Sequence, residues 1–130
     1  MPLGHDHHQA LEAALRLRRA TTEDLNDAVE RFREFWNGCG RRHFEIEEAL
    51  VLPALQGDEE WDVLADRVRQ EHELLRTGAE SLDTVESAHA LGQLLNDHVR
   101  FEERELFQVL EARLDPGRLS TLGREIKSAS

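Results

Sequence analysis

The sequence predicts an all-α fold, an up-down-up-down antiparallel four-helix bundle followed by a short C-terminal helix. Strand signals are scarce, because Val, Ile, Thr and the aromatic residues never alternate over the length of a strand. Residues that favour helices, above all Leu, Ala, Glu and Arg, fill the long segments. The connections between these segments are only a few residues long, so consecutive helices should lie antiparallel. A chain of 130 residues, 39% of them hydrophobic, suits a single domain over residues 1–130 with one modest core.

Residues that cap or interrupt helices divide the chain. Thr21-Thr22-Glu23-Asp24 resembles a capping box, and Asp58 is a candidate N-cap. Asp115 and Pro116 suit the N-cap and first position of the short C-terminal helix. The four predicted bundle helices run from about His5 to Ala20, from Thr22 to about Gln56, from Asp58 to about Ala79, and from Asp83 or Thr84 to Leu114.

The second predicted helix is unusually long and contains Gly38-Cys39-Gly40. Two glycines lower helix stability, so we expect a bend there. No strand precedes this segment and no G-x-G-x-x-G pattern completes it, which argues against a phosphate-binding loop. Cys39 itself is more typical of a small buried residue near a bend than of a redox-active neighbour of a metal.

Composition excludes several classes of protein. The formal charge of −11 has the wrong sign for binding nucleic acid or an anionic membrane surface. The single cysteine excludes an intramolecular disulfide framework, and the absence of tyrosine excludes a tyrosyl radical relay. The N-terminal residues contain no apolar run long enough for a signal peptide, so we expect a cytoplasmic protein.

The histidines carry the clearest functional signal. His43-Phe-Glu-Ile-Glu-Glu and His98-Val-Arg-Phe-Glu-Glu share the pattern H-x-x-x-E-E on the second and fourth helices, which are diagonal partners in such a bundle. At about 100° per residue, His43 and Glu47 face the core, whereas Glu48 lies about 140° from His43 and should face solvent.

The same geometry places His98 and Glu102 on an apolar face and leaves Glu103 off it. His89 is about 180° from His98 and should lie on the opposite side of the helix. Glu105 shares the face of His98 and is a candidate acceptor for a ligand imidazole, or else an edge residue.

The other two helices each add a histidine to the interior. His72 lies on the apolar stripe of the third helix, between Val68 and Leu75. On the first helix, His7 and His8 straddle a buried side predicted from Leu11, Ala14 and Leu15. His7 is nearer on the helical wheel, whereas His8 has the i, i+3, i+7 spacing to Leu11 and Leu15, so both stay candidates.

A metal explains this pattern. A single histidine on an apolar face is more often a hydrogen-bonded core residue, but here four successive helices each present one. Buried carboxylates and unpaired imidazoles are costly, and a bound cation compensates for both. Glu and His at i and i+4 project side by side, so a carboxylate can bridge two metals. Nitrogen and oxygen ligands without thiolate suit iron, manganese or zinc.

These residues resemble the hemerythrin and HHE cation-binding family, whose members are four-helix bundles with a non-heme di-iron centre. The resemblance covers nearly the whole chain and rests on four segments. They are Asp6-His7-His8, His43-Phe-Glu-Ile-Glu-Glu-Ala-Leu-Val-Leu-Pro, Glu71-His72-Glu73-Leu74-Leu75 and His98-Val-Arg-Phe-Glu-Glu-Arg-Glu-Leu-Phe.

The resemblance implies a set of metal ligands, and this chain differs from oxygen-carrying hemerythrins at two positions. Oxygen-carrying hemerythrins have a second histidine where this chain has Arg76, and an Asp five residues after the last histidine where this chain has Glu102 at four. We therefore expect an unsymmetrical metal pair, with Arg76 turned toward solvent or toward a carboxylate such as Glu73 or Glu80. The implied ligands are His43, Glu47, His72, His98, Glu102 and one of His7 or His8, with Glu47 and Glu102 as bridges.

The resemblance also implies a function. The leading expectation is a free-standing di-iron protein that binds or senses O2 or a related small molecule such as NO. One alternative is a di-iron oxidoreductase acting on peroxide or NO, or an iron donor for the repair of iron–sulfur clusters. A second is a metal-storage or structural bundle, and zinc or manganese are the alternative metals.

Overall fold

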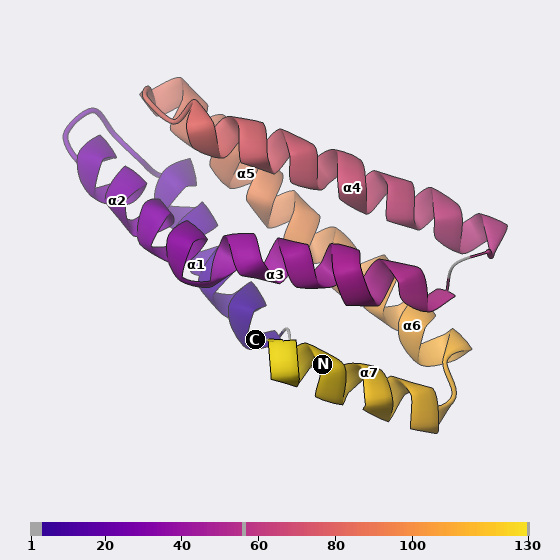
Figure 1. Cartoon of the computed structure of the whole chain (residues 1–130). Helices are drawn as coiled ribbons and strands as arrows, with labels where there is room; N and C mark the ends of the chain where they lie inside the picture. Colours follow the sequence, from indigo (N-terminus) through magenta and orange to yellow (C-terminus); the bar gives the residue numbers. More distant parts are fainter. Residues whose placement is uncertain (1–3, 56, 130) are drawn as a thin grey trace.

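The computed structural model describes residues 4–55 and 57–129, and every regular element within them is helical. The elements form four long rods and a C-terminal helix (Figure 1). The first rod is α1 (Gly4–Arg18), and the third is α4 (Glu59–Glu80). The second rod consists of α2 (Leu25–Phe35), the π turn η1 (Trp36–Gly40), α3 (Arg41–Ile46), the π turn η2 (Glu47–Val51) and the 3-10 turn η3 (Leu52–Leu55). The fourth consists of α5 (Val85–Phe101), the π turn η4 (Glu102–Leu106) and α6 (Phe107–Arg113), and α7 (Pro116–Ala129) follows.

The rods pack as an all-α helical bundle, which confirms the predicted fold class. α1 packs against α2 and α5, and α5 packs against α4. The second rod reaches α4 through the bond between Glu48 and His72, so the two rods that carry the H-x-x-x-E-E segments both contact α1 and α4. None of the helices described in the structure has both the length and the apolar composition that a membrane span requires.

Local hydrogen bonds explain where α4, α5 and α7 begin. Asp58 accepts a bond from the backbone N–H of Trp61 at 3.2 Å, and Asp115 accepts one from that of Arg118 at 2.8 Å, as the sequence predicts. Thr84 and Ser87 form a capping box at the start of α5, with mutual side-chain to backbone bonds of 3.0 and 2.9 Å.

Two helix boundaries predicted from the sequence differ from those in the structure, and a third lies outside the described residues. Thr21 and Asp24 do bond reciprocally, at 2.6 and 3.3 Å, but they do so in the turn ahead of α2. The second rod consequently begins at Leu25 rather than Thr22, and the first ends at Arg18 rather than Ala20. The predicted end of the second helix at Gln56 lies outside the described residues.

The expected bend in the second rod coincides with the π turn η1. Figure 1 shows the axis changing direction between α2 and α3. Gly40 packs closely there, because a Cβ atom at this position would lie 2.7 Å from the ring of Phe35 and would displace that ring. Two further π turns, η2 and η4, begin at Glu47 and Glu102. Such turns are rare and occur frequently at functional sites.

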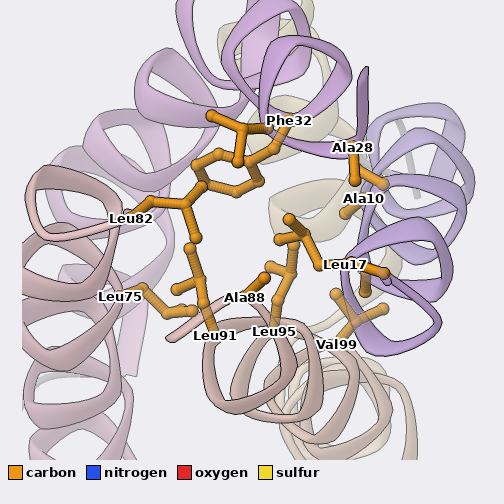
Figure 2. Close-up of a cluster of buried hydrophobic side chains, with 14 of the residues drawn as sticks. Ala10, Leu17, Ala28, Phe32, Leu75, Leu82, Ala88, Leu91, Leu95 and Val99 are labelled. Carbon is orange, nitrogen blue, oxygen red and sulfur yellow. The ribbon is translucent and has the colours of Figure 1, made fainter. Parts of the chain in front are cut away.

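Two apolar clusters occupy different levels of the bundle. The first contains Phe32, Leu75 and Leu95 among others (Figure 2). The second contains Trp61 and Val68, and the indole N–H of Trp61 fixes it by donating to the carbonyl of Leu52 at 2.8 Å. On α4, His72 lies between Val68 of the second cluster and Leu75 of the first. The buried histidine therefore occupies a layer between the two apolar clusters.

α7 covers the second rod near the second apolar cluster. Its Leu122 and Ile126 are buried members of that cluster. Arg118 donates to the carbonyl of Ala54 at 2.9 Å, and Arg42 of α3 donates to the carbonyl of Ala129 at 3.0 Å. The helix is thus attached to the bundle at both ends.

Candidate metal centre

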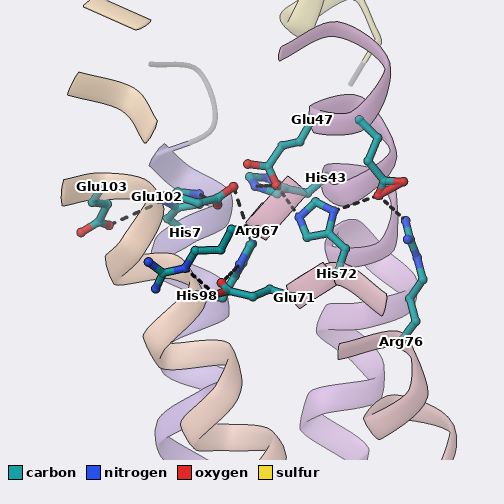
Figure 3. A network of polar contacts seen from close by, with 11 residues as sticks. His7, His43, Glu47, Arg67, Glu71, His72, Arg76, His98, Glu102 and Glu103 are labelled. Atoms are coloured by element: carbon teal, nitrogen blue, oxygen red, sulfur yellow. Dashed lines mark hydrogen bonds and ion pairs between the residues drawn. The ribbon is translucent and has the colours of Figure 1, made fainter. Parts of the chain in front are cut away.

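Six buried polar side chains from all four rods meet in the layer between the apolar clusters (Figure 3). None is more than 4% exposed. They form two overlapping groups, in each of which the potential ligand atoms lie within 4.8 Å of one another. The groups are His7, His43, Glu47 and Glu102, and Glu47, His72, His98 and Glu102.

Glu47 lies between imidazoles of two different rods. Its Oε1 is 3.4 Å from Nε2 of His43, one turn earlier on the same rod, and 3.2 Å from Nε2 of His72 on α4. The i, i+4 spacing explains the first contact, whereas the second depends on how α4 packs against the second rod. The side chain is fully buried, as the helical phase predicts.

Glu102 has the corresponding place on the fourth rod. Its Oε2 is 3.6 Å from Nε2 of His98, and its Oε1 is 3.1 Å from Nε2 of His7 on α1. Both carboxylates therefore join a histidine of their own rod to one of another rod. This arrangement places two acidic groups at the centre and four imidazoles around them (Figure 3).

The first rod contributes His7 and not His8. His7 is 3% exposed, and its ring stacks on that of Phe107 with centroids 5.1 Å apart and 14° between the planes. His8 is exposed and belongs to neither group. Leu15 is 38% exposed, so the spacing that favoured His8 pointed to a residue outside the buried face. The inward stripe of α1 instead passes through Ala14 and Leu17.

The donor atoms of this cluster fit a metal pair. Eight buried side-chain atoms have no hydrogen-bond partner among the described residues, although burial of such atoms normally requires one. Every one is an imidazole nitrogen or a carboxylate oxygen, the donor types suited to iron, manganese and zinc. They are Nδ1 and Nε2 of His7, Nε2 of His72 and His98, and both carboxylate oxygens of Glu47 and Glu102.

Glu48 positions His72 from outside the cluster. Nδ1 of His72 and Oε2 of Glu48 are 2.8 Å apart, and Arg76 donates to the same oxygen at 2.7 Å. Arg76 also donates to Glu73 at 3.1 Å, which agrees with the expected turn toward a carboxylate. The prediction that Glu48 faces solvent is wrong, because this residue is half-buried and reaches across to α4. The wider turn η2 advances by fewer degrees per residue than an α-helix, which rotates Glu48 inward.

Glu71 positions His98 from outside the cluster, as Glu48 positions His72. Nδ1 of His98 and Oε1 of Glu71 are 2.7 Å apart, and Arg67 donates to the other oxygen of Glu71 at 2.9 Å. The guanidinium of Arg67 also lies 3.7 Å from the centre of the Phe101 ring. Glu105, the acceptor considered from sequence, is exposed and contacts Arg67 at 3.4 Å instead.

A carboxylate that accepts from Nδ1–H fixes the tautomer of the imidazole. When the rings of His72 and His98 are neutral, the remaining nitrogen, Nε2, carries no proton and faces the carboxylates of the cluster. This is the tautomer that a metal requires. Neither Glu48 nor Glu71 was singled out for this role from the sequence, although the Glu-Glu doublet after His43 was a signal for Glu48.

The second glutamate of the other doublet, Glu103, also approaches a histidine of another rod. It is half-buried, and its Oε1 lies 3.6 Å from Nδ1 of His7, beyond hydrogen-bond distance. Glu103 therefore belongs to neither group but still approaches the first rod. In both segments the first glutamate enters the cluster and the second contacts a histidine from a neighbouring rod.

Burial and mutual repulsion govern the charges of the two central carboxyls. Burial raises the pKa of Glu102, and the adjacent charge of Glu47 raises it further, to about 7. Burial alone would also raise the pKa of Glu47, but the positive charge of His43 and the protonated Glu102 outweigh it and hold that pKa well below its usual range. Without a cation, Glu102 therefore holds a proton below about pH 7 and loses it as the pH rises through that value.

The pKa values of Glu48 and Glu71, the two carboxyls that bond to histidines from outside the cluster, are shifted in favour of the ionised form. Burial tends to raise the pKa of Glu48, but Arg76 and His72 lower it overall. The pKa of Glu71 is likewise lowered despite burial, because His98 and Arg67 bond to it. Both carboxylates stay ionised at neutral pH and can accept the imidazole protons.

The four imidazoles divide equally between the two groups. His7 and His43 belong to one, and His72 and His98 belong to the other. The unsymmetrical metal pair stays a prediction, and Arg76 belongs to neither group but bonds to Glu48 and Glu73. His89 is exposed, and its Nε2 lies 2.8 Å from the carbonyl of Ala20, as its helical phase predicts.

The model of the hemerythrin HHE cation binding domain matches residues 3–110, which include all six members of the buried cluster. α7 lies beyond the matched range. Comparison with curated proteins and with solved structures gives no significant match.

Proposed function

We propose, for a chain that belongs to the hemerythrin HHE cation-binding family, that the buried cluster binds two iron ions. His7 and His43 would hold one ion, His72 and His98 the other, and Glu47 and Glu102 would bind both. The single observation that supports this assignment is the set of eight buried donor atoms without hydrogen-bond partners among the described residues. Manganese and zinc have similar ligand preferences and are the alternatives.

The proposed function is to bind or sense O2, or a related small molecule such as NO. Iron in this cluster would supply reversible binding and electron donation to such a molecule. The chain itself excludes bulk water and large substrates, since all six side chains are at most 4% exposed and lie between two apolar clusters. The buried site therefore favours a diatomic molecule over a larger substrate.

The test combines metal analysis with optical spectra. Tag-free protein loaded with iron should contain two iron ions per chain and show a spectral change with O2 that reverses under vacuum. Turnover of peroxide or NO would instead favour the oxidoreductase, and transfer of iron to a cluster-free acceptor would favour the repair function. Bound metal without any spectral response would favour storage or a structural role. A cytoplasmic location stays a prediction, to be tested by cell fractionation.

A further inference from the structure

Two chains of charged hydrogen bonds reach the His72/His98 group from the surface. In one, Arg76 bonds to Glu48 at 2.7 Å and Glu48 to His72 at 2.8 Å. All three lie on one edge of the cluster, and His72 itself is fully buried. The guanidinium holds the carboxylate, and the carboxylate holds the ring.

The second chain has the same order of groups. Arg67 bonds to Glu71 at 2.9 Å, and Glu71 bonds to His98 at 2.7 Å. The side chain of Glu71 is 18% exposed, so this charge-assisted bond is only partly screened by water. Both imidazoles of this group are therefore fixed in orientation and in tautomer.

His7, in the other group, has no comparable partner. Neither of its ring nitrogens forms a hydrogen bond to any residue that the structure describes. The nearest outer carboxylate oxygen, on Glu103, is 3.6 Å away, and the other oxygen of Glu103 accepts from Arg100 at 3.2 Å. Packing against Phe107 places the ring of His7, but no hydrogen bond sets its tautomer.

This difference has a consequence for affinity. An imidazole whose second nitrogen donates to a carboxylate is a more basic ligand and needs less ordering when a cation binds. Removal of such an outer partner typically costs roughly 10–100-fold in metal affinity. Because both histidines of one group have these partners and His7 of the other does not, the two groups should not bind metal equally.

We propose that Glu48 and Glu71 are positioning residues that make the His72/His98 group the tighter metal position. This group fills first, and the His7/His43 group fills second and loses its metal first. The inference rests on the proposed function, since it requires two metal positions. The inference adds an order of metal loading to the proposed function. The number of imidazoles does not predict this order, because it is equal in the two groups.

The test is a titration of metal-free protein with Co²⁺ alone, in which calorimetry and the optical absorption of bound cobalt measure each binding step. The wild-type chain should bind two ions in steps whose dissociation constants differ by about tenfold or more. His7→Ala should retain the tight step and lose the weak one. Loss of the tight step in His7→Ala would overturn the inference.

The positioning role is tested in Glu48→Gln and Glu71→Gln. Each should weaken the tight step roughly 10–100-fold and leave the weak step nearly unchanged. In metal-free protein, nitrogen NMR should show His72 protonated at Nδ1, and Glu48→Gln should reduce that preference. A purely structural role would not change the tautomer. An unchanged tight step in both variants would overturn the inference.

Controls separate these effects from loss of folding. Glu45→Gln removes an exposed glutamate of α3 that contacts Arg42, and it should leave both steps unchanged. If Glu48→Gln does not fold, Arg76→Gln tests the same series of hydrogen bonds, from Arg76 through Glu48 to His72. This variant should weaken only the tight binding step. Two equal steps in the wild type would overturn the order of loading while the proposed function stands, whereas failure to bind two ions would overturn both.

Discussion

The ring of Phe44 lies parallel to the imidazole of His72, with centroids 4.1 Å apart and 11° between the planes. The same ring meets His98 edge-on at 5.6 Å and Trp36 edge-on at 5.4 Å. Phe44 is 3% exposed and belongs to the first apolar cluster. It therefore forms the boundary between that cluster and the polar layer, a role the sequence did not reveal.

Phe44→Leu should destabilise the metal-free protein by about 1–3 kcal/mol, because it leaves a cavity beside His72 and removes the ring stacking. It should also speed release of bound metal, since water then reaches the cluster. Urea unfolding and the rate of metal transfer to a chelator measure the two effects. Leu74→Ala, at a position 57% exposed, should change stability by less than about 0.5 kcal/mol. Equal effects of the two substitutions would contradict the role of Phe44.

His43→Ala and His98→Ala should each lower the bound metal below two ions per chain. They should also destabilise the fold by a few kcal/mol, because removal of one partner leaves the buried Glu47 or Glu102 poorly compensated. His89→Ala should do neither, since His89 is exposed and contacts only the carbonyl of Ala20 among the groups described for it. Metal analysis and urea unfolding of the three variants provide the check. Metal loss in His89→Ala similar to that in His43→Ala would refute the helical phase.

The two histidines of the first rod should behave differently. His7→Ala should reduce metal content to about one ion per chain, because His7 is buried with its Nε2 3.1 Å from Glu102. His8→Ala should retain full metal content, since His8 is exposed and lies in neither group. Elemental analysis of the two single variants and of the double variant measures how much metal each histidine helps to hold. Full metal content in both single variants, with loss only in the double variant, would show that the two residues replace one another.

Metal-free protein should be most stable near pH 5 and less stable at pH 8. The pKa of Glu102 is raised from 4.5 to about 7, so its contribution is present below pH 4.5 and is lost as pH rises to 7. The pKa of His98 is also raised, burial being outweighed by the charge of Glu102, so stability falls further above pH 6.5. The lowered pKa of Glu47 acts oppositely and costs stability below pH 4.5.

The expected decrease from pH 5 to pH 8 is of the order of 3 kcal/mol. Urea unfolding in the presence of a chelator measures it. Glu102→Gln should flatten the profile, and metal loading should restore stability at pH 8 because bound cations require ionised carboxylates. Stability of the metal-free wild type that rises from pH 5 to pH 8 would contradict this assignment of charges.

The sequence by itself determined the fold class and five of the six buried cluster residues. Helix-favouring composition and short connections predict the bundle, and a rotation of about 100° per residue places His43 with Glu47 and His98 with Glu102. His72 follows from the apolar stripe between Val68 and Leu75. These predictions succeed because each depends only on the phase of residues within a single helix.

Only the tertiary structure decided the choice of His7 over His8, the contacts of Glu48 and Glu71, and the equal division of the imidazoles. Each depends on how one helix is rotated and shifted against another, which a helical wheel does not contain. Adjacent residues such as His7 and His8 point about 100° apart, so packing of α1 against α5 selects one of them. The π turns η2 and η4 add a change of phase that a constant 100° per residue cannot anticipate.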